Sequence, residues 1–159
     1  MRVQWAGRRE GHVRVKSWVH TGLAVRNLDD AIAFYRAAFG YEVTYQVRGM
    51  TEQVAAVTGI AGQSCDLAQL KSPVSGHVLE LVQFHGHEDT ATPQPVSPLR
   101  PGQAHVAFVV EDLDAALMKV EALGARRLGG FAVLPGYRSA YLTEPSGTFF
   151  ELEQVDDIA

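Results

Sequence analysis

Two histidines and two glutamates occupy corresponding places in the two halves of this 159-residue chain. Each histidine begins a short apolar strand pattern, and each glutamate lies inside a later one. A carboxylate in an apolar strand is costly to bury unless it is paired, hydrogen-bonded or bound to a metal. Two neutral imidazoles and two carboxylates balance the charge of one divalent cation, and nitrogen and oxygen donors without sulfur suit Fe, Mn, Co, Ni or Zn. These four residues are His20, Glu80, His105 and Glu151.

The four residues belong to an internal repeat. The segment "HTGLAVRNLDDAIAFYRAAFGYE" (20–42) aligns with "HVAFVVEDLDAALMKVEALGARR" (105–127). Each copy runs from an apolar strand through a polar turn into a helix, where apolar residues recur at helical spacing until a glycine closes the helix. The periodicity then changes to two, which predicts three further strands in each half. These strands are expected at 41–47, 64–70 and 77–84, and at 125–133, 139–144 and 148–155.

Strand alternation assigns the histidines to a face. His20 shares a face with Gly22 and Ala24, whereas the bulkier Leu23 and Val25 point to the opposite side. The second copy divides in the same way. We therefore expect the bulky face to pack under the helix and the histidines to lie on the open face.

Composition and charge exclude several classes of function. Hydrophobic residues make up 47% of the chain and charged residues 20%, as in ordinary globular proteins. No apolar run approaches the roughly 20 residues that span a bilayer, and the first residues lack the apolar block of a secretory signal, so a cytoplasmic protein without a membrane partner is expected. The formal charge is −4 and the basic residues are scattered, which argues against nucleic acid. Cys65 is the only cysteine, which excludes an intrachain disulfide.

The extent of the repeat and the proline-rich stretch between its copies predict four segments. Residues 1–14 precede the repeat as an N-terminal extension, and residues 15–84 form the first module. Residues 85–103 are rich in proline and polar residues and are expected to form a linker or cover loop. The second module covers 104–155. Inside the first module, the segment "MTEQVAAVTGIAG", which carries Glu52, predicts a short inserted helix.

These motifs resemble the vicinal oxygen chelate superfamily, which includes glyoxalase I, methylmalonyl-CoA epimerase, extradiol dioxygenases and drug resistance proteins. The resemblance covers residues 19–155 and is carried by "HTGLAVRNLDDAIAFYRAAFG", "ELVQF", "HVAFVVEDLDAAL" and "PSGTFFELEQ". It implies an α+β fold in which two βαβββ modules form an open barrel-like mixed sheet around a cleft, with the helices outside. It also implies a homodimer, a small-molecule substrate, and one divalent metal ion bound by His20, Glu80, His105 and Glu151.

The predicted function is that of a metal-dependent isomerase or lyase of the glyoxalase and epimerase type. Four protein ligands leave two positions of a six-coordinate ion for two neighbouring substrate oxygens. The reaction that fits is proton transfer alpha to a carbonyl through a metal-bound enediolate. The candidate bases are Glu151, Glu80 and Glu52, the last because it lies where related epimerases present a glutamate; a solvated helix face is the alternative for Glu52.

Two other functions and one structural question stay open. An extradiol ring-cleavage dioxygenase would use two histidines and one carboxylate, and Glu80 argues against it by filling a position that should be open. A non-catalytic drug or natural-product binding protein would not need the ligands. His85 and His87 have metal-ligand spacing, but they follow the strand in a polar stretch, which favours a solvated loop. The two modules can complete the site within one chain or across a dimer, and the sequence does not indicate the substrate.

Overall fold

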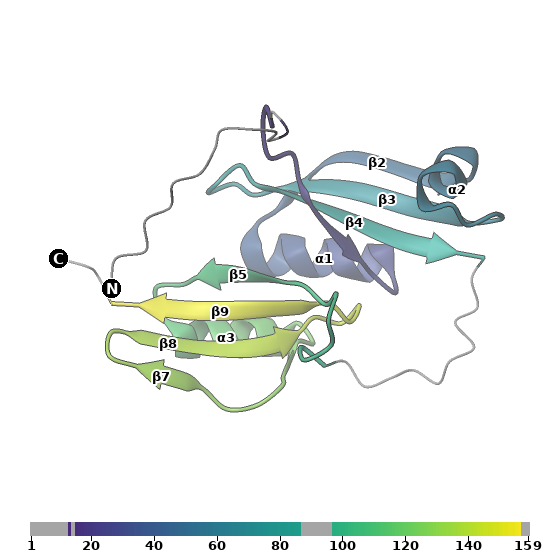
Figure 1. Cartoon of the computed structure of the whole chain (residues 1–159). Helices are drawn as coiled ribbons and strands as arrows, with labels where there is room; N and C mark the ends of the chain where they lie inside the picture. Colours follow the sequence, from purple (N-terminus) through teal and green to yellow (C-terminus); the bar gives the residue numbers. More distant parts are fainter. Residues whose placement is uncertain (1–12, 14, 87–96, 157–159) are drawn as a thin grey trace, which may run out of the picture.

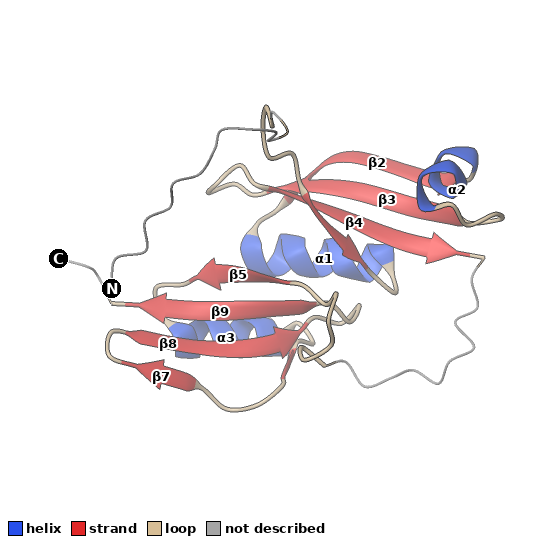
Figure 2. Cartoon of the chain, viewed as in Figure 1, coloured by secondary structure: helices blue, strands red, loops and turns tan. Residues whose placement is uncertain are grey.

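A computed structural model describes residues 13, 15–86 and 97–156 (Figure 1). The described residues form two sheets of mixed strands and three helices, without a closed barrel, which confirms the expected α+β class (Figure 2). No helix among them is both long and apolar enough to cross a membrane. Apart from residue 13, the predicted extension at 1–14 lies outside the described residues, and so does 87–96 of the predicted linker.

The first sheet has the strand order β1-β4-β3-β2. β1 runs parallel to β4, and β3 is antiparallel to both β4 and β2. The order of one strand, one helix and three strands along the chain agrees with the plan that the repeat predicts, and the pairing of these strands comes from the structure. The elements are β1 (Thr21–Ala24), α1 (Leu28–Phe39), β2 (Glu42–Met50), α2 (Glu52–Thr58), β3 (Ser64–Lys71) and β4 (Val78–His85).

The second sheet repeats this plan with the order β5-β9-β8-β6, and β7 also pairs with β8. The single strand predicted at 125–133 is wrong, because this stretch forms two short strands, β6 and β7. Gly129 and Gly130 lie between them, and glycine disfavours an unbroken strand. The elements are β5 (His105–Val109), α3 (Leu113–Ala122), β6 (Arg126–Arg127), β7 (Ala132–Leu134), β8 (Tyr137–Thr143) and β9 (Phe149–Val155).

The two longer helices begin at equivalent caps. The side chain of Asn27 accepts a hydrogen bond of 3.1 Å from the backbone N–H of Asp30, and the side chain of Asp112 accepts one of 2.9 Å from Ala115. Each cap satisfies a backbone donor that the first helical turn leaves unpaired. Both caps lie in the polar turn between strand and helix that the repeat predicts.

One hydrophobic core joins the helix-covered faces of both sheets. Leu23 and Val25 are buried in it, as the alternation of the first strand predicts. Phe39 of α1 stacks on Phe108 of β5 with ring centroids 4.1 Å apart. Because the helix-covered sides pack together, the opposite faces of the two sheets remain as separate open surfaces.

Candidate metal centre

The first histidine–glutamate pair lies on the open face of the first sheet. His20 directly precedes β1, and the parallel register aligns Gly22 with Glu80 of β4. Residues two apart share a strand face, so His20 and Glu80 project to the same side. The Nε2 atom of His20 is 3.5 Å from Oε1 of Glu80. Gln69 of β3 stands opposite Glu80, and its side-chain amide donates a 2.9 Å hydrogen bond to Oε2.

The second pair has the same construction in the second sheet. β5 is parallel to β9, and Ala107 aligns with Glu151 as Gly22 aligns with Glu80. The Nε2 atom of His105 lies 3.4 Å from Oε2 of Glu151. The register places Tyr141 of β8 opposite Glu151, and the Tyr141 hydroxyl is 3.2 Å from Nε2 of His105. Tyr137 donates a 3.2 Å hydrogen bond to Oε1 of Glu151.

The four predicted ligands therefore form two equivalent pairs rather than one cluster of four. Among the described residues, no three histidine, cysteine, aspartate or glutamate side chains lie close enough together to hold a metal ion. The described part of the chain thus presents two pairs, each with one imidazole and one carboxylate, and each pair is called a half-site below.

The donor set of each half-site is compatible with a divalent cation. Imidazole nitrogen and carboxylate oxygen are ligands that Mn²⁺, Fe²⁺, Co²⁺, Ni²⁺ and Zn²⁺ accept. In each pair the imidazole is partly exposed and the carboxylate lies beside it, and the carboxylate of Glu151 is buried. The Nδ1 atom of His20 is buried and has no hydrogen-bond partner in the described part of the chain. Its Nε2 atom is thus the ring nitrogen that faces Glu80 and the open surface.

Two tyrosine hydroxyls lie within hydrogen-bond distance of the histidine and the glutamate of the second half-site. Burial, followed by the charge of Glu151, raises the pKa of Tyr141 above its ordinary value. The hydroxyl therefore stays protonated at neutral pH and can donate to a nitrogen or oxygen acceptor. The sequence by itself did not pair Tyr141 or Tyr137 with these residues. Their role as partners of His105 and Glu151 depends on strand register, which the sequence alone does not supply.

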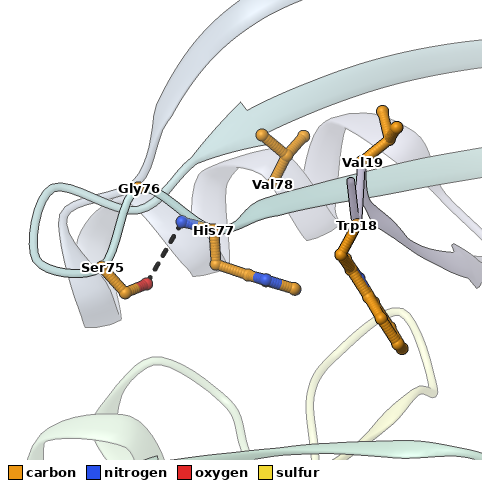
Figure 3. A pocket seen from close by; sticks show the side chains of 6 residues that line it. All are labelled: Trp18, Val19, Ser75, Gly76, His77 and Val78. Carbon is orange, nitrogen blue, oxygen red and sulfur yellow. Dashed lines mark hydrogen bonds between the residues drawn. The ribbon is translucent and has the colours of Figure 1, made fainter. Parts of the chain in front are cut away.

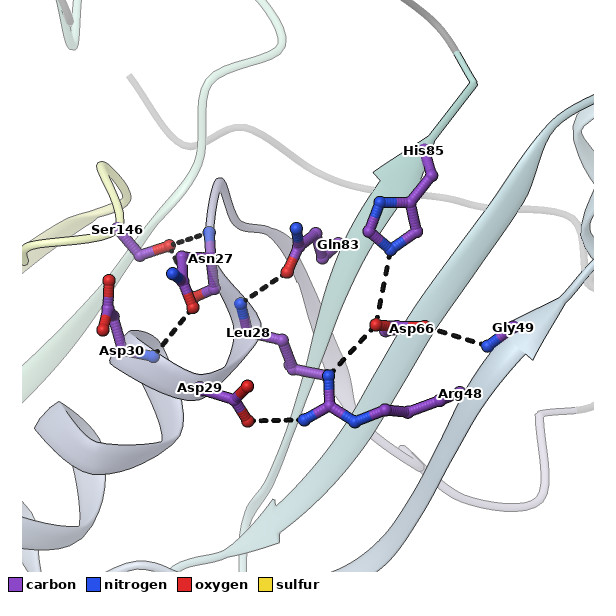
Figure 4. A network of polar contacts seen from close by, with 10 residues as sticks. All are labelled: Asn27, Leu28, Asp29, Asp30, Arg48, Gly49, Asp66, Gln83, His85 and Ser146. Atoms are coloured by element: carbon purple, nitrogen blue, oxygen red, sulfur yellow. Dashed lines mark hydrogen bonds and ion pairs between the residues drawn. The ribbon is translucent and has the colours of Figure 1, made fainter.

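The other predicted site residues lie away from the pairs. Glu52 is exposed at the start of α2, and no hydrogen bond or ion pair of the described residues ties it to Glu80. His85 lies 3.4 Å from Asp66, which also binds Arg48 (Figure 4). His87 lies outside the described residues.

A hollow of about 500 Å³ adjoins the segment before β1 (Figure 3). Trp18 and His77 both line it, and the imidazole of His77 points toward Trp18. His77 also makes a 3.0 Å hydrogen bond with the Thr21 hydroxyl. The lining residues are Trp18, Val19, Ser75, Gly76, His77 and Val78, and none of them belongs to the two pairs.

Several solved structures are similar to this one in fold. A glyoxalase family protein from Bacillus cereus is similar in structure, with a TM-score of 0.77 and 22% identity over 94% of this chain and 99% of that one. Fosfomycin resistance protein FosX from Listeria monocytogenes, solved with Mn(II) and sulfate, has a TM-score of 0.56 and 18% identity over 89% of this chain and 93% of that one. Among curated proteins, no sequence matches.

The family model described as "Glyoxalase/Bleomycin resistance protein/Dioxygenase superfamily" matches residues 17–152. This range includes both histidine–glutamate pairs and all strands except the last three residues of β9. The chain therefore belongs to the glyoxalase/bleomycin resistance protein/dioxygenase superfamily.

Proposed function

We propose that this protein is a divalent-metal-dependent enzyme that transfers a proton at a carbon next to a carbonyl group. The observation that carries the proposal is the repetition of one histidine–carboxylate pair at equivalent register positions of two sheets. A single such pair is readily explained as an ordinary strand contact. The same pair occurs on the open face of each sheet, and binding of one cation by both pairs explains why it is repeated.

We further propose that the metal site combines the first half-site of one chain with the second half-site of a partner copy in a homodimer. Within the described part of one chain, His20–Glu80 and His105–Glu151 do not come together. β1 and β5, which adjoin the pairs, are both outermost strands of their sheets. In a symmetric dimer, each first half-site can face the second half-site of the other chain, which yields two identical sites.

Each group of residues at the site would have a separate role in the reaction. His20, Glu80, His105 and Glu151 would hold the ion, whose bound form supplies electrostatic stabilisation for negative charge on two neighbouring substrate oxygens. A glutamate takes the proton from the carbon, breaking its C–H bond, and returns it to the same or the adjacent carbon. The Tyr137 hydroxyl, which donates a hydrogen bond to Glu151, would help to orient that carboxylate.

Metal content and proton exchange test the proposal together. Protein purified without chelator should contain close to one Mn, Fe, Co, Ni or Zn ion per chain. The metal-loaded protein should exchange the alpha proton of a 2-oxo acid or a hemithioacetal with D₂O, followed by NMR. His105→Ala should lose the metal and the exchange while remaining folded by circular dichroism, because it removes a ligand from an exposed position.

The same assays separate the alternatives. Oxygen uptake with catechols and an iron content near one per chain, without proton exchange, would identify ring-cleavage chemistry instead. Tight binding of an aromatic drug that chelator and His105→Ala leave unchanged would identify a binding protein. Either result would contradict the proposed reaction.

A further inference from the structure

Strand β5 has one backbone edge without a strand partner. Among the described strands, β5 pairs only with β9. The backbone N–H of Val110 donates a 2.9 Å hydrogen bond to the carbonyl of Glu153 in β9. Backbone groups of successive strand residues point to opposite sides, so those of Ala107 and Val109 point away from β9. An extended segment can add to such an edge as a further strand.

An apolar groove of about 550 Å³ lies along this edge of β5. Residues 106–110 line it, together with residues from the end of α1 and from the stretch that joins β3 to β4. Val74 and Val109 in this lining are 94% and 69% exposed. Exposed apolar side chains gathered beside an unpaired strand are typical of a surface that another segment covers.

The segment before β1, residues 15–19, has a matching apolar character, and we call it the arm. It belongs to no helix or strand. Its side chains of Val15, Trp18 and Val19 are 78%, 78% and 68% exposed in the single chain. Valine and tryptophan favour strands, so the arm suits an added strand with an apolar contact.

Charge favours contact between the start of the chain and the rest of it. Residues 1–16 include five arginine or lysine residues and one glutamate. The remaining residues include nine arginine or lysine residues and 17 aspartate or glutamate residues. The formal charge of −4 therefore divides into +4 for the start of the chain and −8 for the rest. A basic arm is attracted to the acidic body of another copy.

We propose that the arm of one chain adds to β5 of a second copy as an antiparallel strand and fills the apolar groove beside it. This inference rests on the proposed function, because the shared metal site brings His20 of the partner subunit next to His105. Two imidazole nitrogens bound to one ion lie no more than about 4 Å apart. The arm directly precedes His20, and only an antiparallel course leads it along the residues that follow His105.

The facing histidines set the register of the added strand. Opposite residues of antiparallel strands have a constant sum of residue numbers, so Trp18 of the arm faces Ala107 and Lys16 of the arm faces Val109. The small side chain of Ala107 leaves room for the indole. Val109 is in register with Glu153 of β9, so the Lys16 ammonium group meets a carboxylate.

The other face of the arm lies in the groove. Val15 and Val19 alternate with the lysine and the tryptophan, so they point to the opposite side of the strand. In this register they face Val110 and Val106, which both line the groove. Removal of these apolar side chains from water stabilises the contact.

Disulfide trapping tests the pairing in the full chain. Opposite residues of antiparallel strands lie about 5 Å apart, a distance that suits a disulfide. Lys16→Cys/Val109→Cys should therefore form a covalent dimer under mild oxidation, seen on a gel without reductant. Cys65 is the only native cysteine and is buried. The control is Lys16→Cys/Met118→Cys, with Met118 70% exposed on α3, and it should remain a monomer on the gel.

The fluorescence of Trp18 follows the contact with the arm intact. Trp5 and Trp18 are the two tryptophans, so Trp5→Phe leaves one fluorophore. Its emission should move to shorter wavelength as the protein concentration rises through the dimer dissociation constant. Val15→Asp should raise that constant about 10-fold or more, because it brings a charge into the groove. Met118→Asp should change it less than about twofold, because Met118 lies outside the contact.

The outcomes separate this inference from the proposed function. A trapped dimer, a concentration-dependent shift of the Trp18 emission and weaker dimerisation of Val15→Asp support the arm contact. A disulfide within one chain, no disulfide at all, or a Val15→Asp dimer as tight as the wild type overturns it. The metal content of the wild type decides the proposed function separately. A metal-binding protein without a trapped dimer refutes only the arm contact, and a metal-free monomer refutes both.

Discussion

A site shared between two chains predicts that two inactive variants restore each other. His20→Ala removes a ligand from the first half-site, and His105→Ala removes one from the second. In a homodimer of either variant, both shared sites lack one ligand. In a mixed dimer, one shared site lacks both histidines and the other keeps all four ligands. The reason is that each site combines the first half-site of one chain with the second half-site of the other.

The expected recovery follows from this geometry. Random pairing of equal amounts makes about half of the dimers mixed, and each mixed dimer has one intact site of two. Metal content and proton exchange should therefore return to about one quarter of the wild-type value per chain. Mixed dimers isolated through two different tags should hold about one ion per dimer, half of the wild-type content.

The assay requires subunit exchange and a matched control. The two variants are refolded together from urea, loaded with Mn(II), desalted, and analysed for bound metal. The control mixes His105→Ala with Glu151→Gln, which both alter the second half-site, so every site of the mixed dimer keeps one defect and no metal should return. The shared site is refuted if tagged mixed dimers form but bind no more metal than the parents, or if the control recovers equally.

Two further predictions concern the fold around the site. Phe150→Ala should lower the free energy of unfolding by about 3–5 kcal/mol in urea titrations, because Phe150 is fully buried between the halves and touches the ring of Phe34 at a centroid distance of 5.5 Å. Val57→Ala is the control, because Val57 is 84% exposed, and it should change the free energy of unfolding by less than about 0.5 kcal/mol. An equal loss of stability in the two variants would show that the shared core does not join the halves. Asp66→Asn should lower stability at pH 7 by no more than about 1 kcal/mol, since the Gly49 N–H, Arg48 and His85 hold the pKa of Asp66 below its usual value. Ionised Asp66 contributes stability above the unfolded pKa of about 3.9 and loses it as the pH falls through the lower folded pKa. The difference between variant and wild type should therefore shrink below about pH 4, and a difference that stays constant from pH 7 to pH 3 would contradict this.

The sequence by itself determined the order of the elements, apart from the division of 125–133 into β6 and β7, and the buried face of β1. Apolar spacing, the caps and the closing glycines are local signals, so the two helices and the repeated strand plan follow from residues close together in the chain. The alternation of Leu23 and Val25 against His20 likewise fixed which side of β1 is buried. The repeat then singled out two histidines and two glutamates, and the resemblance to the superfamily implied that they are metal ligands.

Only the tertiary structure decided how these residues are grouped and what holds them. Strand register depends on partners far apart in the sequence, so the pairing of Gln69 with Glu80 and of Tyr141 with Glu151 could not be read from local patterns. The contact between Phe39 and Phe108 joins the two halves through their helix-covered sides. That packing leaves the two open faces apart, and it is the reason that one chain presents two half-sites where the sequence suggested a single group of four.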